Sequence, residues 1–376
     1  MELEFTSEQD ELRSAVSAVL AHECGMDVVR GMVEKDLAPD ALWAHMVELG
    51  WPALTITPDA GGLGLGMVEV AVVVEELGRV LAPGPFLPTV TQFAPAIREL
   101  GSAEQQAHFL GAVATGDITG TLALTEEGGS YDPARVTATA TPAGDDVMLS
   151  GTKESVLDGT AADEIVVVAR QPGSDRDEGV GAFVVPRADL SVTPIESLDP
   201  TRRLAHFTLD GARVGPDRIL GMPGPATAAG LRRVVEEATT ALALETVGAC
   251  QSIFDITLEF VKHREQFGVP VGSFQAVKHK FADMLIALER ARATGYFAAL
   301  TIAEDDERRA LAVASAKATA GECARFLAKE GIQLHGGIGY TWEHDMHLYV
   351  RRVRANAALF GTAAHHRAEV ARLIGL

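Results

Sequence analysis

The sequence predicts an α+β fold in which a region of short antiparallel strands separates two helical regions. The hydrophobic period is helical up to about residue 118, changes to short β-branched runs, and is helical again after about residue 224. No helices of about 10–15 residues alternate with the strands, which argues against a parallel dinucleotide-binding sheet. We therefore expect three domains: 1–118 (helical), 119–224 (β) and 225–376 (a helical bundle).

Length and charge narrow the classes of function. A chain of 376 residues is too long for one ordinary core, and a formal net charge of −20 disfavours nucleic acid and anionic membranes as partners. Cys24, Cys250 and Cys323 lie far apart without a CxxC pair, as expected for buried thiols in a reducing compartment. No secretory leader and no run of about 18 apolar residues is visible, so we expect a cytoplasmic protein.

The N-terminal region contains three helical patterns. The first follows the capping-type pair Thr6-Ser7, the second begins near Pro39 and stops at Gly50, and the third is MVEVAVVVEELGRVLA. The loop DAGGLGLG precedes the third pattern. It lacks GxGxxG spacing and follows no clear strand, so we do not assign it to phosphate binding.

The middle and C-terminal regions differ in period. Short β-branched segments punctuated by Gly, Pro and Asp, such as EIVVVAR and GVGAFVVP, predict the hairpins of a small sheet or barrel. After residue 224, long alanine-rich amphipathic patterns with short connections predict a four-helix bundle. The fourth element of this bundle combines HDMHLYVRRVRANAAL with AAHHRAEVARLIGL.

Two C-terminal segments are candidates for a site. In HREQFGVPVGSFQAVKH, Arg264 and Phe267 stand at a predicted helix end, where a dipole-compensating arginine and a core phenylalanine are the plainer explanation. In IQLHGGIGYTWEHDMHLYVRRVR, the glycines allow close approach of another surface or a planar ligand. The only short histidine spacing there is His344-x-x-His347, so we predict no metal site.

These segments resemble those of the acyl-CoA dehydrogenase family. The family's order and spacing are kept, over essentially the whole chain, by REQFG, SFQAVKHKFADM, IQLHGGIGYTWEHDMHLYVRRV, PDAGGLGLG and LDPTRRLAHFTLDGARV. The resemblance implies a helical domain, a β-domain and a C-terminal bundle that bind FAD and oxidise an acyl-CoA thioester between Cα and Cβ. A carboxylate removes the α-proton in such enzymes. The resemblance also implies an FAD shared between subunits, with a neighbour's bundle holding the adenine dinucleotide end.

By this resemblance, the half of the site that faces a neighbouring subunit is kept. Arg264 matches the arginine that reaches the FAD diphosphate. The remaining residues assigned to the cofactor by their match to the family are Phe267, Gln275, Gln333, Leu334, His335, Gly336, Gly337 and Thr362.

The half that faces the flavin departs from the family pattern. The family's T-E-P-G-A-G-S-D is TEEGGSYD here, which keeps Thr125 and Glu126 but has Tyr131 in place of the serine. The family's K-x-W-I-T-N is KESVLDG here. Ser155 therefore replaces the aromatic residue beside the flavin, and Leu157 replaces the hydroxyl residue near N5.

The catalytic base is also absent from its usual place. The family's Y-E-G-T is LFGT in this chain, which puts Phe360 at the position of the base. Some relatives carry the base on the long helix, where Ala238 aligns. A displaced base remains open: Glu237 first, then Glu236 or Glu245, which lies about 10 Å further along the helix.

Three functions follow from the resemblance. The first is the base-lacking subunit of a heteromeric, tetrameric acyl-CoA dehydrogenase, which completes a second subunit's FAD site and acts on an acyl-CoA substrate such as a steroid side-chain thioester. The second is a self-sufficient homo-oligomeric dehydrogenase with a displaced base. The third is a non-enzymatic module that binds acyl-CoA or a protein.

Overall fold

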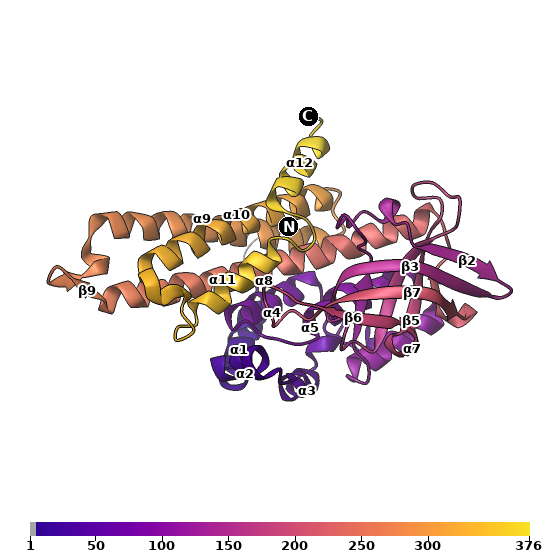
Figure 1. Cartoon of the computed structure of the whole chain (residues 1–376), viewed down its shortest axis with the longest axis horizontal. Coiled ribbons are helices and arrows are strands. Elements are labelled where there is room, and N and C mark those ends of the chain that lie inside the picture. Colours follow the sequence, from indigo (N-terminus) through magenta and orange to yellow (C-terminus); the bar gives the residue numbers. More distant parts are fainter. Residues whose placement is uncertain (1–4) are drawn as a thin grey trace. The chain divides into compact units, whose positions relative to one another are not determined.

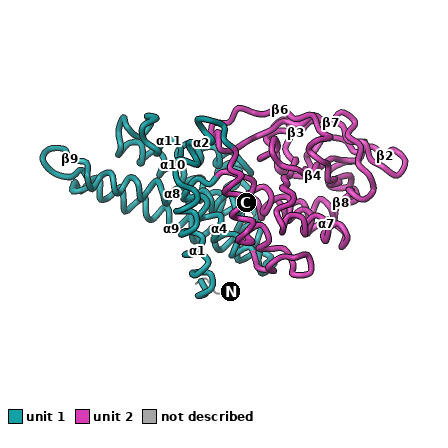
Figure 2. The backbone as a smooth tube through the Cα atoms, turned by 90° about the horizontal axis from the view of Figure 1, so that it is seen from below, with its two compact units in different colours: residues 1–37, 67–82, 239–376 teal, residues 38–66, 83–238 magenta. Residues whose placement is uncertain are grey.

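The computed structural model of the chain describes residues 5–376 and contains two compact units (Figure 2). Unit 1 consists of the described residues up to Leu37 together with Met67–Ala82 and Thr239–Leu376, and unit 2 consists of Ala38–Gly66 and Pro83–Ala238. The division falls inside one helix, α8 (Pro225–His263). The N-terminal helices are thus distributed over both units, and the three domain boundaries drawn in chain order stay predictions.

Unit 1 is helical, as the sequence predicted (Figure 1). Besides most of α8, its helices are α1 (Ser7–Glu23), α2 (Met26–Lys35), α4 (Met67–Arg79), α9 (Gln275–Ala303), α10 (Arg309–His335), α11 (Met346–Asn356) and α12 (Ala363–Leu373). Thr6 caps α1 by accepting a hydrogen bond from the Gln9 backbone N–H. The last predicted element is two helices, because positive φ angles at Phe360 (55°) and Gly361 (92°) end a right-handed helix.

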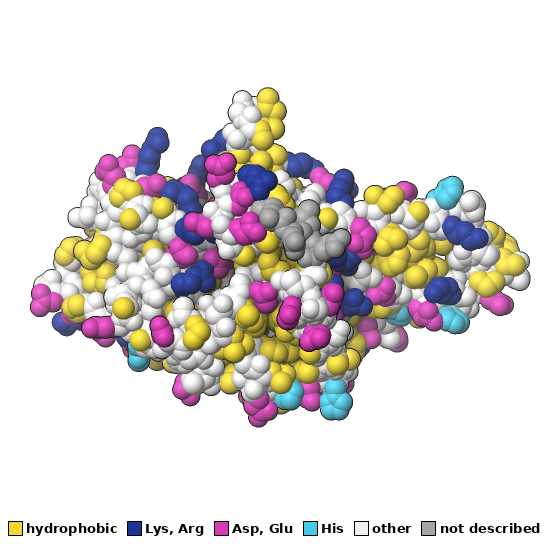
Figure 3. All heavy atoms as spheres, turned by 180° about the vertical axis from the view of Figure 1, so that it is seen from behind, with side chains coloured by type: hydrophobic (Ala, Val, Ile, Leu, Met, Phe, Trp, Pro, Cys, Tyr) yellow, Lys and Arg dark blue, Asp and Glu magenta, His cyan; other side chains and the backbone are white. Residues whose placement is uncertain are grey.

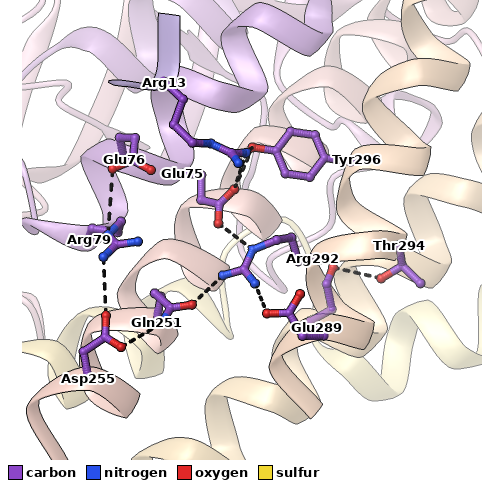
Figure 4. A network of polar contacts seen from close by, with 11 residues as sticks. Arg13, Glu75, Glu76, Arg79, Gln251, Asp255, Glu289, Arg292, Thr294 and Tyr296 are labelled. Atoms are coloured by element: carbon purple, nitrogen blue, oxygen red, sulfur yellow. Dashed lines mark hydrogen bonds and ion pairs between the residues drawn. The ribbon is translucent and has the colours of Figure 1, made fainter. Parts of the chain in front are cut away.

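A polar network ties four helices of unit 1 together (Figure 4). The Glu75 carboxylate of α4 accepts hydrogen bonds from Arg292 Nε (2.8 Å) and from the Tyr296 hydroxyl (2.6 Å), both on α9. Arg292 also donates to Gln251 of α8 (2.6 Å), and Arg13 of α1 donates to Tyr296 (2.9 Å). Burial and then the Glu75 charge raise the pKa of Tyr296. The network fixes how these helices pack.

Helix α8 passes very close to α4 in unit 1. A Cβ atom on Gly248 would lie 1.9 Å from the Glu75 carbonyl oxygen, and one on Gly78 would lie 2.1 Å from the Glu245 carbonyl oxygen, so only glycine permits this approach. Among the described residues, α8 alone is long and apolar enough to cross a membrane by length and composition. Because 72% of its most apolar stretch is buried in the fold, α8 is a core helix.

Unit 2 is built around a mostly antiparallel sheet with the strand order β6-β7-β3-β2-β4-β5-β8, in which β1 pairs with β4. The strands are β1 (Gly120–Ala123), β2 (Thr139–Ala143), β3 (Asp146–Leu157), β4 (Glu164–Arg170), β5 (Val180–Pro186), β6 (Ser191–Ile195), β7 (Leu204–Val214) and β8 (Ile219–Gly221). β1 runs parallel to β4, which differs from the predicted antiparallel arrangement. The α+β class and the order of helical, β and helical regions are confirmed.

The helices of unit 2 cover part of this sheet. They are α3 (Asp40–Glu48), α5 (Phe86–Pro88), α6 (Ala94–Leu100), α7 (Ala103–Ala114) and the first turns of α8. Apolar side chains of α6, α7 and the sheet form one core with Phe93, whose ring would lie 2.2 Å from a Cβ atom on Gly120. Glycine is therefore required where β1 begins.

Candidate functional site

The first part of the candidate site is a hairpin at the end of α8. The short strands β9 (Glu265–Gln266) and β10 (Val269–Pro270) are joined by Phe267 and Gly268, both with positive φ (57° and 78°), as a two-residue hairpin requires. Phe267 is a poor residue for this conformation, and its side chain is 93% exposed. A strained, exposed aromatic residue of this kind indicates a surface that another molecule covers.

The end of α10 lies against the same end of α8. The His335 ring stacks on the Phe260 ring with centroids 4.4 Å apart, and the Phe260 carbonyl accepts a hydrogen bond from the Arg264 backbone N–H (2.9 Å). Lys280 of α9 forms an ion pair with Glu330 of α10 nearby. The structure therefore gathers at one end of unit 1 the predicted cofactor residues Arg264, Phe267, Gln275, Gln333, Leu334, His335, Gly336 and Gly337. We call this group the arm end.

The arm end offers hydrogen-bond donors that are free to bind a ligand. Arg264 is exposed, and its guanidinium forms no ion pair or hydrogen bond with any of residues 5–376. Gln333 is exposed, and the exposed Gln275 amide has a single side-chain hydrogen bond within residues 5–376, to the His279 ring (3.3 Å). Toward β9, on the right of Figure 3, basic and histidine side chains stand among apolar ones. In a chain of net charge −20, such a local group of donors fits an anionic diphosphate.

The paired glycines of the arm end leave open space. A Cβ atom on Gly336 would meet no described atom within 4 Å, and one on Gly337 would meet only the Tyr340 hydroxyl at 3.9 Å. Gly336 is required by its positive φ of 67°, but nothing in the described chain requires glycine at 337. This is the cradle that a closely approaching ligand would fill, so the residues present fit the dinucleotide end of FAD.

Thr362 lies away from the arm end. Its side chain caps α12 by accepting a hydrogen bond from the His365 backbone N–H (3.2 Å). A Cβ atom on Gly321 of α10 would lie 3.1 Å from Ala363, next to this cap. Because residue 321 is about 21 Å from His335 along the axis of α10, Thr362 is separated from the other predicted cofactor residues.

In unit 2, Thr125 and Glu126, which match the family pattern at the start of TEEGGSYD, stabilise the fold. The Thr125 hydroxyl donates to the Glu154 carbonyl, and the Glu126 carboxylate accepts from Lys153 Nζ (2.6 Å) and from the Thr137 backbone N–H (2.7 Å). Lys153 is completely buried, and burial lowers its pKa to about 8. Thr125 and Glu126 therefore hold their loop on β3, a role that the motif alone did not predict.

The rest of that loop is poorly suited to a flavin. Tyr131, which stands in place of the family serine, packs against the core of unit 2. The loop borders a hollow of about 380 Å³ that is lined by Leu124, Glu126, Glu127, Gly128, Ser130, Arg135 and Val136. Glu127 adds a carboxylate where an anionic cofactor would approach.

A larger hollow of unit 2 lies elsewhere. It measures about 710 Å³ and is lined by Leu100–Ser102, Glu104, Gln105, His108, Phe109 and Pro216–Leu220. None of the residues predicted for the cofactor or for the base lines it, and its walls carry no group of buried polar atoms that would identify a ligand. We therefore assign it no role.

Strand β3 is irregular where the family places its flavin contacts. The pairing with β7 shifts between Lys153 and Val156, and Ser155 has a positive φ of 54°. Leu157 is buried, and its carbonyl accepts a hydrogen bond from the Thr121 hydroxyl (2.7 Å). Ser155 offers no aromatic surface and Leu157 no side-chain donor, so this stretch does not fit an isoalloxazine ring.

The corner between α11 and α12 carries Phe360, which is buried. Its carbonyl accepts a hydrogen bond from the buried His366 Nε2 (2.7 Å), and burial lowers the pKa of His366 to about 4. Lys317 of α10 is buried as well and donates to the Asn356 carbonyl (2.7 Å). Neither partner was predicted. A lysine within the small apolar residues of AVASAKATA was the available signal for Lys317.

Two of the glutamates considered as displaced bases are held by arginine. Glu237 is buried and forms an ion pair with Arg98 within unit 2. Glu245 is buried in unit 1, where one carboxylate oxygen accepts from Arg352 (2.7 Å) and the other from Asn356 (2.9 Å).

The chain is similar to known proteins over nearly its whole length. Three family models match it: the N-terminal (residues 6–117), middle (121–211) and C-terminal (232–375) domains of acyl-CoA dehydrogenase. It is 33% identical to the Mycobacterium tuberculosis protein named Acyl-CoA dehydrogenase IpdE2, over 94% of this chain and 92% of that protein. It is 28% identical to the short-chain specific acyl-CoA dehydrogenase of Mus musculus, over 89% and 82%.

Two of the similar solved structures carry the names of two proteins each. The Tcur3481–Tcur3483 steroid ACAD is 33% identical, with a TM-score of 0.86 and coverage of 98% of this chain and 97% of that chain. The ChsE4–ChsE5 complex from Mycobacterium tuberculosis is 27% identical, with a TM-score of 0.88 and complete coverage of both chains (100%).

Proposed function

Because this chain belongs to the acyl-CoA dehydrogenase family, whose members are FAD-binding oxidoreductases acting on CH–CH bonds, we propose a specific place for it there. It is one subunit of a heteromer that completes a second subunit's FAD site and does not supply the base. The observation that carries this proposal is an asymmetry. The arm end leaves Arg264 and the glycine cradle open, whereas Leu157 and Phe360 are buried in the chain's own interior and the partly buried Tyr131 packs against the core of unit 2.

The arm end would act by binding and orientation. Arg264 contributes a charge-assisted hydrogen bond to a diphosphate, and Gly336 and Gly337 admit the attached nucleoside. FAD, when bound, supplies the acceptor for the hydride that leaves Cβ of the acyl group. The proton on Cα requires a base, and Phe360 has no atom that can accept it. The base therefore comes from the second subunit.

The contacts of Glu237 and Glu245 support this assignment over a displaced base. A base needs a carboxylate oxygen that is free to face the substrate. Both oxygens of Glu245 are engaged. Glu237 is buried, and its Oε1 is held by Arg98. If the chain were instead a self-sufficient dehydrogenase, Glu237→Gln would abolish turnover of the purified homo-oligomer.

The similar structures support a partner of the same family. One is the ChsE4–ChsE5 complex, and another is named the Tcur3481–Tcur3483 steroid ACAD. By extension, we propose a heterotetramer with a second acyl-CoA dehydrogenase chain, an acyl-CoA of the steroid side-chain type as substrate, and a cytoplasmic location.

The test begins with purification of the chain alone and together with an acyl-CoA dehydrogenase encoded next to it. We expect a colourless, inactive chain alone and a yellow, active complex that contains one flavin for every two chains. A yellow and active homo-oligomer would contradict the proposal.

Arg264→Ala in the complex tests the arm end directly. Loss of a charged hydrogen bond worth about 1.5–3 kcal/mol predicts FAD affinity about 10- to 150-fold lower. Titration of the flavin-free complex with FAD measures this change. Lys278→Ala, an exposed cation on α9, is the matched control and should leave the affinity within about 2-fold. An Arg264→Ala complex that binds FAD like the native complex would exclude this role.

A further inference from the structure

His335 lies at the end of α10, and only one of its two ring nitrogens forms a hydrogen bond within the described chain. Its Nδ1 donates to the Gly331 carbonyl (2.8 Å), so Nδ1 carries the proton in the neutral ring and Nε2 is left as an acceptor. His335 is only 6% exposed, and its Nε2 has no hydrogen-bond partner among the described residues. A buried acceptor left unpaired costs about 1–3 kcal/mol, so this nitrogen calls for a donor from outside the described chain.

The ring is also held in one orientation. It stacks on Phe260 at an interplanar angle of 26° and meets the edge of the His344 ring at a centroid distance of 4.8 Å. A Cβ atom on Gly339 would lie 2.9 Å from the Cβ atom of His335, so the segment after α10 folds tightly over this residue. Because the Nδ1 edge faces the backbone of α10, the Nε2 edge is turned away from it. The acceptor is thus positioned before any ligand arrives.

The surroundings of this nitrogen identify the ligand group. Arg264 follows Phe260 by one helical turn, and Gly336 and Gly337 follow His335 directly. The unpaired acceptor therefore belongs to the residue that directly precedes a glycine cradle that nothing in the described chain fills. Its stacking partner Phe260 lies one helical turn before Arg264, whose free guanidinium is suited to a diphosphate. Burial lowers the pKa of His335, which keeps the ring neutral at physiological pH.

We infer that His335 is a specificity-determining residue of the shared cofactor site, where its Nε2 accepts a hydrogen bond from a donor on the adenosine half of FAD. This inference rests on the proposed function, because the FAD is the one that the second subunit binds. Adenosine offers two kinds of donor, the 6-amino group of adenine and the hydroxyl groups of ribose. An acceptor of this kind rejects a nucleotide that lacks the matching donor, because its own lone pair is then left unpaired.

The test compares FAD with two analogues on the purified, flavin-free heteromeric complex. One analogue carries hypoxanthine in place of adenine and so lacks the 6-amino group; the other carries 2′,3′-dideoxyribose in its adenosine half and so lacks both ribose hydroxyl groups. Dissociation constants come from quenching of flavin fluorescence. We expect one of the two analogues to bind about 5- to 150-fold more weakly than FAD, in line with one unpaired buried acceptor. Equal binding of all three ligands would overturn the inference and assign Nε2 to a water molecule.

Variants separate this role from a structural one. In a His335→Leu complex, the difference between FAD and the weaker analogue should shrink to about 2-fold, because the acceptor is gone. His347→Leu is the matched control, since His347 also has a buried, unpartnered Nε2 but packs against Trp342. It should keep the full discrimination. Discrimination that persists in His335→Leu, or disappears equally in His347→Leu, would contradict the inference.

The proposed function is tested separately by the same titration. Arg264→Ala should weaken the binding of FAD and of both analogues by the same factor, and it should preserve the discrimination. If Arg264→Ala has no effect on any of the three ligands, the proposed sharing of FAD fails, whatever His335 does. Thermal melting of each variant complex confirms that it remains folded, and the comparison of ligands on the native complex needs no variant.

Discussion

Lys317 is a buried lysine of α10 that contacts the corner between α11 and α12. Its Nζ donates to the Asn356 carbonyl at the end of α11 (2.7 Å), where a cation compensates the helix dipole. It lies among the small side chains of α10, and burial lowers its pKa to about 7. One hydrogen bond and a helix end thus support an amine that is otherwise out of contact with water.

This burial predicts a dependence of stability on pH. The pKa of Lys317 falls from its ordinary 10.5 to about 7 on folding, so between these values the unfolded chain binds more protons than the folded chain. Stability therefore rises with pH across this window. Urea unfolding between about pH 7 and pH 9.5 should show this rise in the native chain and a smaller rise in Lys317→Met.

Lys278→Met is the control for this experiment, because Lys278 is exposed on α9. It should keep the pH dependence of the native chain. If Lys317→Met and the native chain gain stability in parallel over the window, the buried amine is not the source of the effect.

At the scale of the element, the ion pair between Glu126 and Lys153 helps to hold the loop from Thr125 to Thr137 on β3. Glu126→Gln leaves the fully buried Lys153 without its counter-charge and is expected to lower the free energy of unfolding by about 3 kcal/mol. Urea unfolding measures the change. Glu127→Gln, in the exposed neighbouring position, should change it by less than about 0.5 kcal/mol. Equal effects of the two substitutions would refute a stabilising role for Glu126.

The elements also show what the sequence does and does not determine. Long periodic segments such as α8 and α10 were predictable, because a helical period over many residues has one simple solution. The break at Phe360 was not, because it depends on a buried hydrogen bond from His366 and on two positive φ angles. The parallel pairing of β1 with β4 was missed for a related reason, since pairing between distant segments leaves no local pattern.

The residues of the candidate site also fall into two groups: those that a contiguous motif predicts, and those whose contacts only the fold reveals. Arg264 and the glycines after His335 are contiguous motifs, so a resemblance was enough to predict them, and the structure brings them together at the arm end. Thr362 belonged to a contiguous motif as well, but its hydroxyl caps α12. The partners of Glu126 and Glu245 come from 27 and 107 residues away, and only the fold reveals that these carboxylates are engaged.

At the scale of the whole molecule, the departures from the family pattern are spread over both units. Phe360 belongs to unit 1, whereas Tyr131, Ser155 and Leu157 belong to unit 2. A single substitution therefore should not rebuild a flavin site. Phe360→Glu restores a carboxylate at the family position, but it supplies neither an aromatic neighbour nor a donor for the flavin.

We expect the Phe360→Glu complex to keep one flavin for every two chains and to gain no activity when the partner's own base is replaced. The buried carboxylate should also destabilise the chain by about 2 kcal/mol or more. Flavin content and acyl-CoA-dependent bleaching measure the first outcome. Phe360→Leu controls for the loss of the ring. A second flavin in the Phe360→Glu complex would show that the corner alone determines which subunit is catalytic.

The exposed ring of Phe267 has a consequence for the abundance of unassembled copies of the chain in the cell. A copy made without its partner displays this aromatic residue at the tip of a hairpin, close to the exposed Phe274. Molecular chaperones and proteases recognise exposed apolar segments of this kind. In the proposed heteromer, the second subunit covers this ring, so we expect the steady-state abundance of this chain to follow the supply of the second subunit.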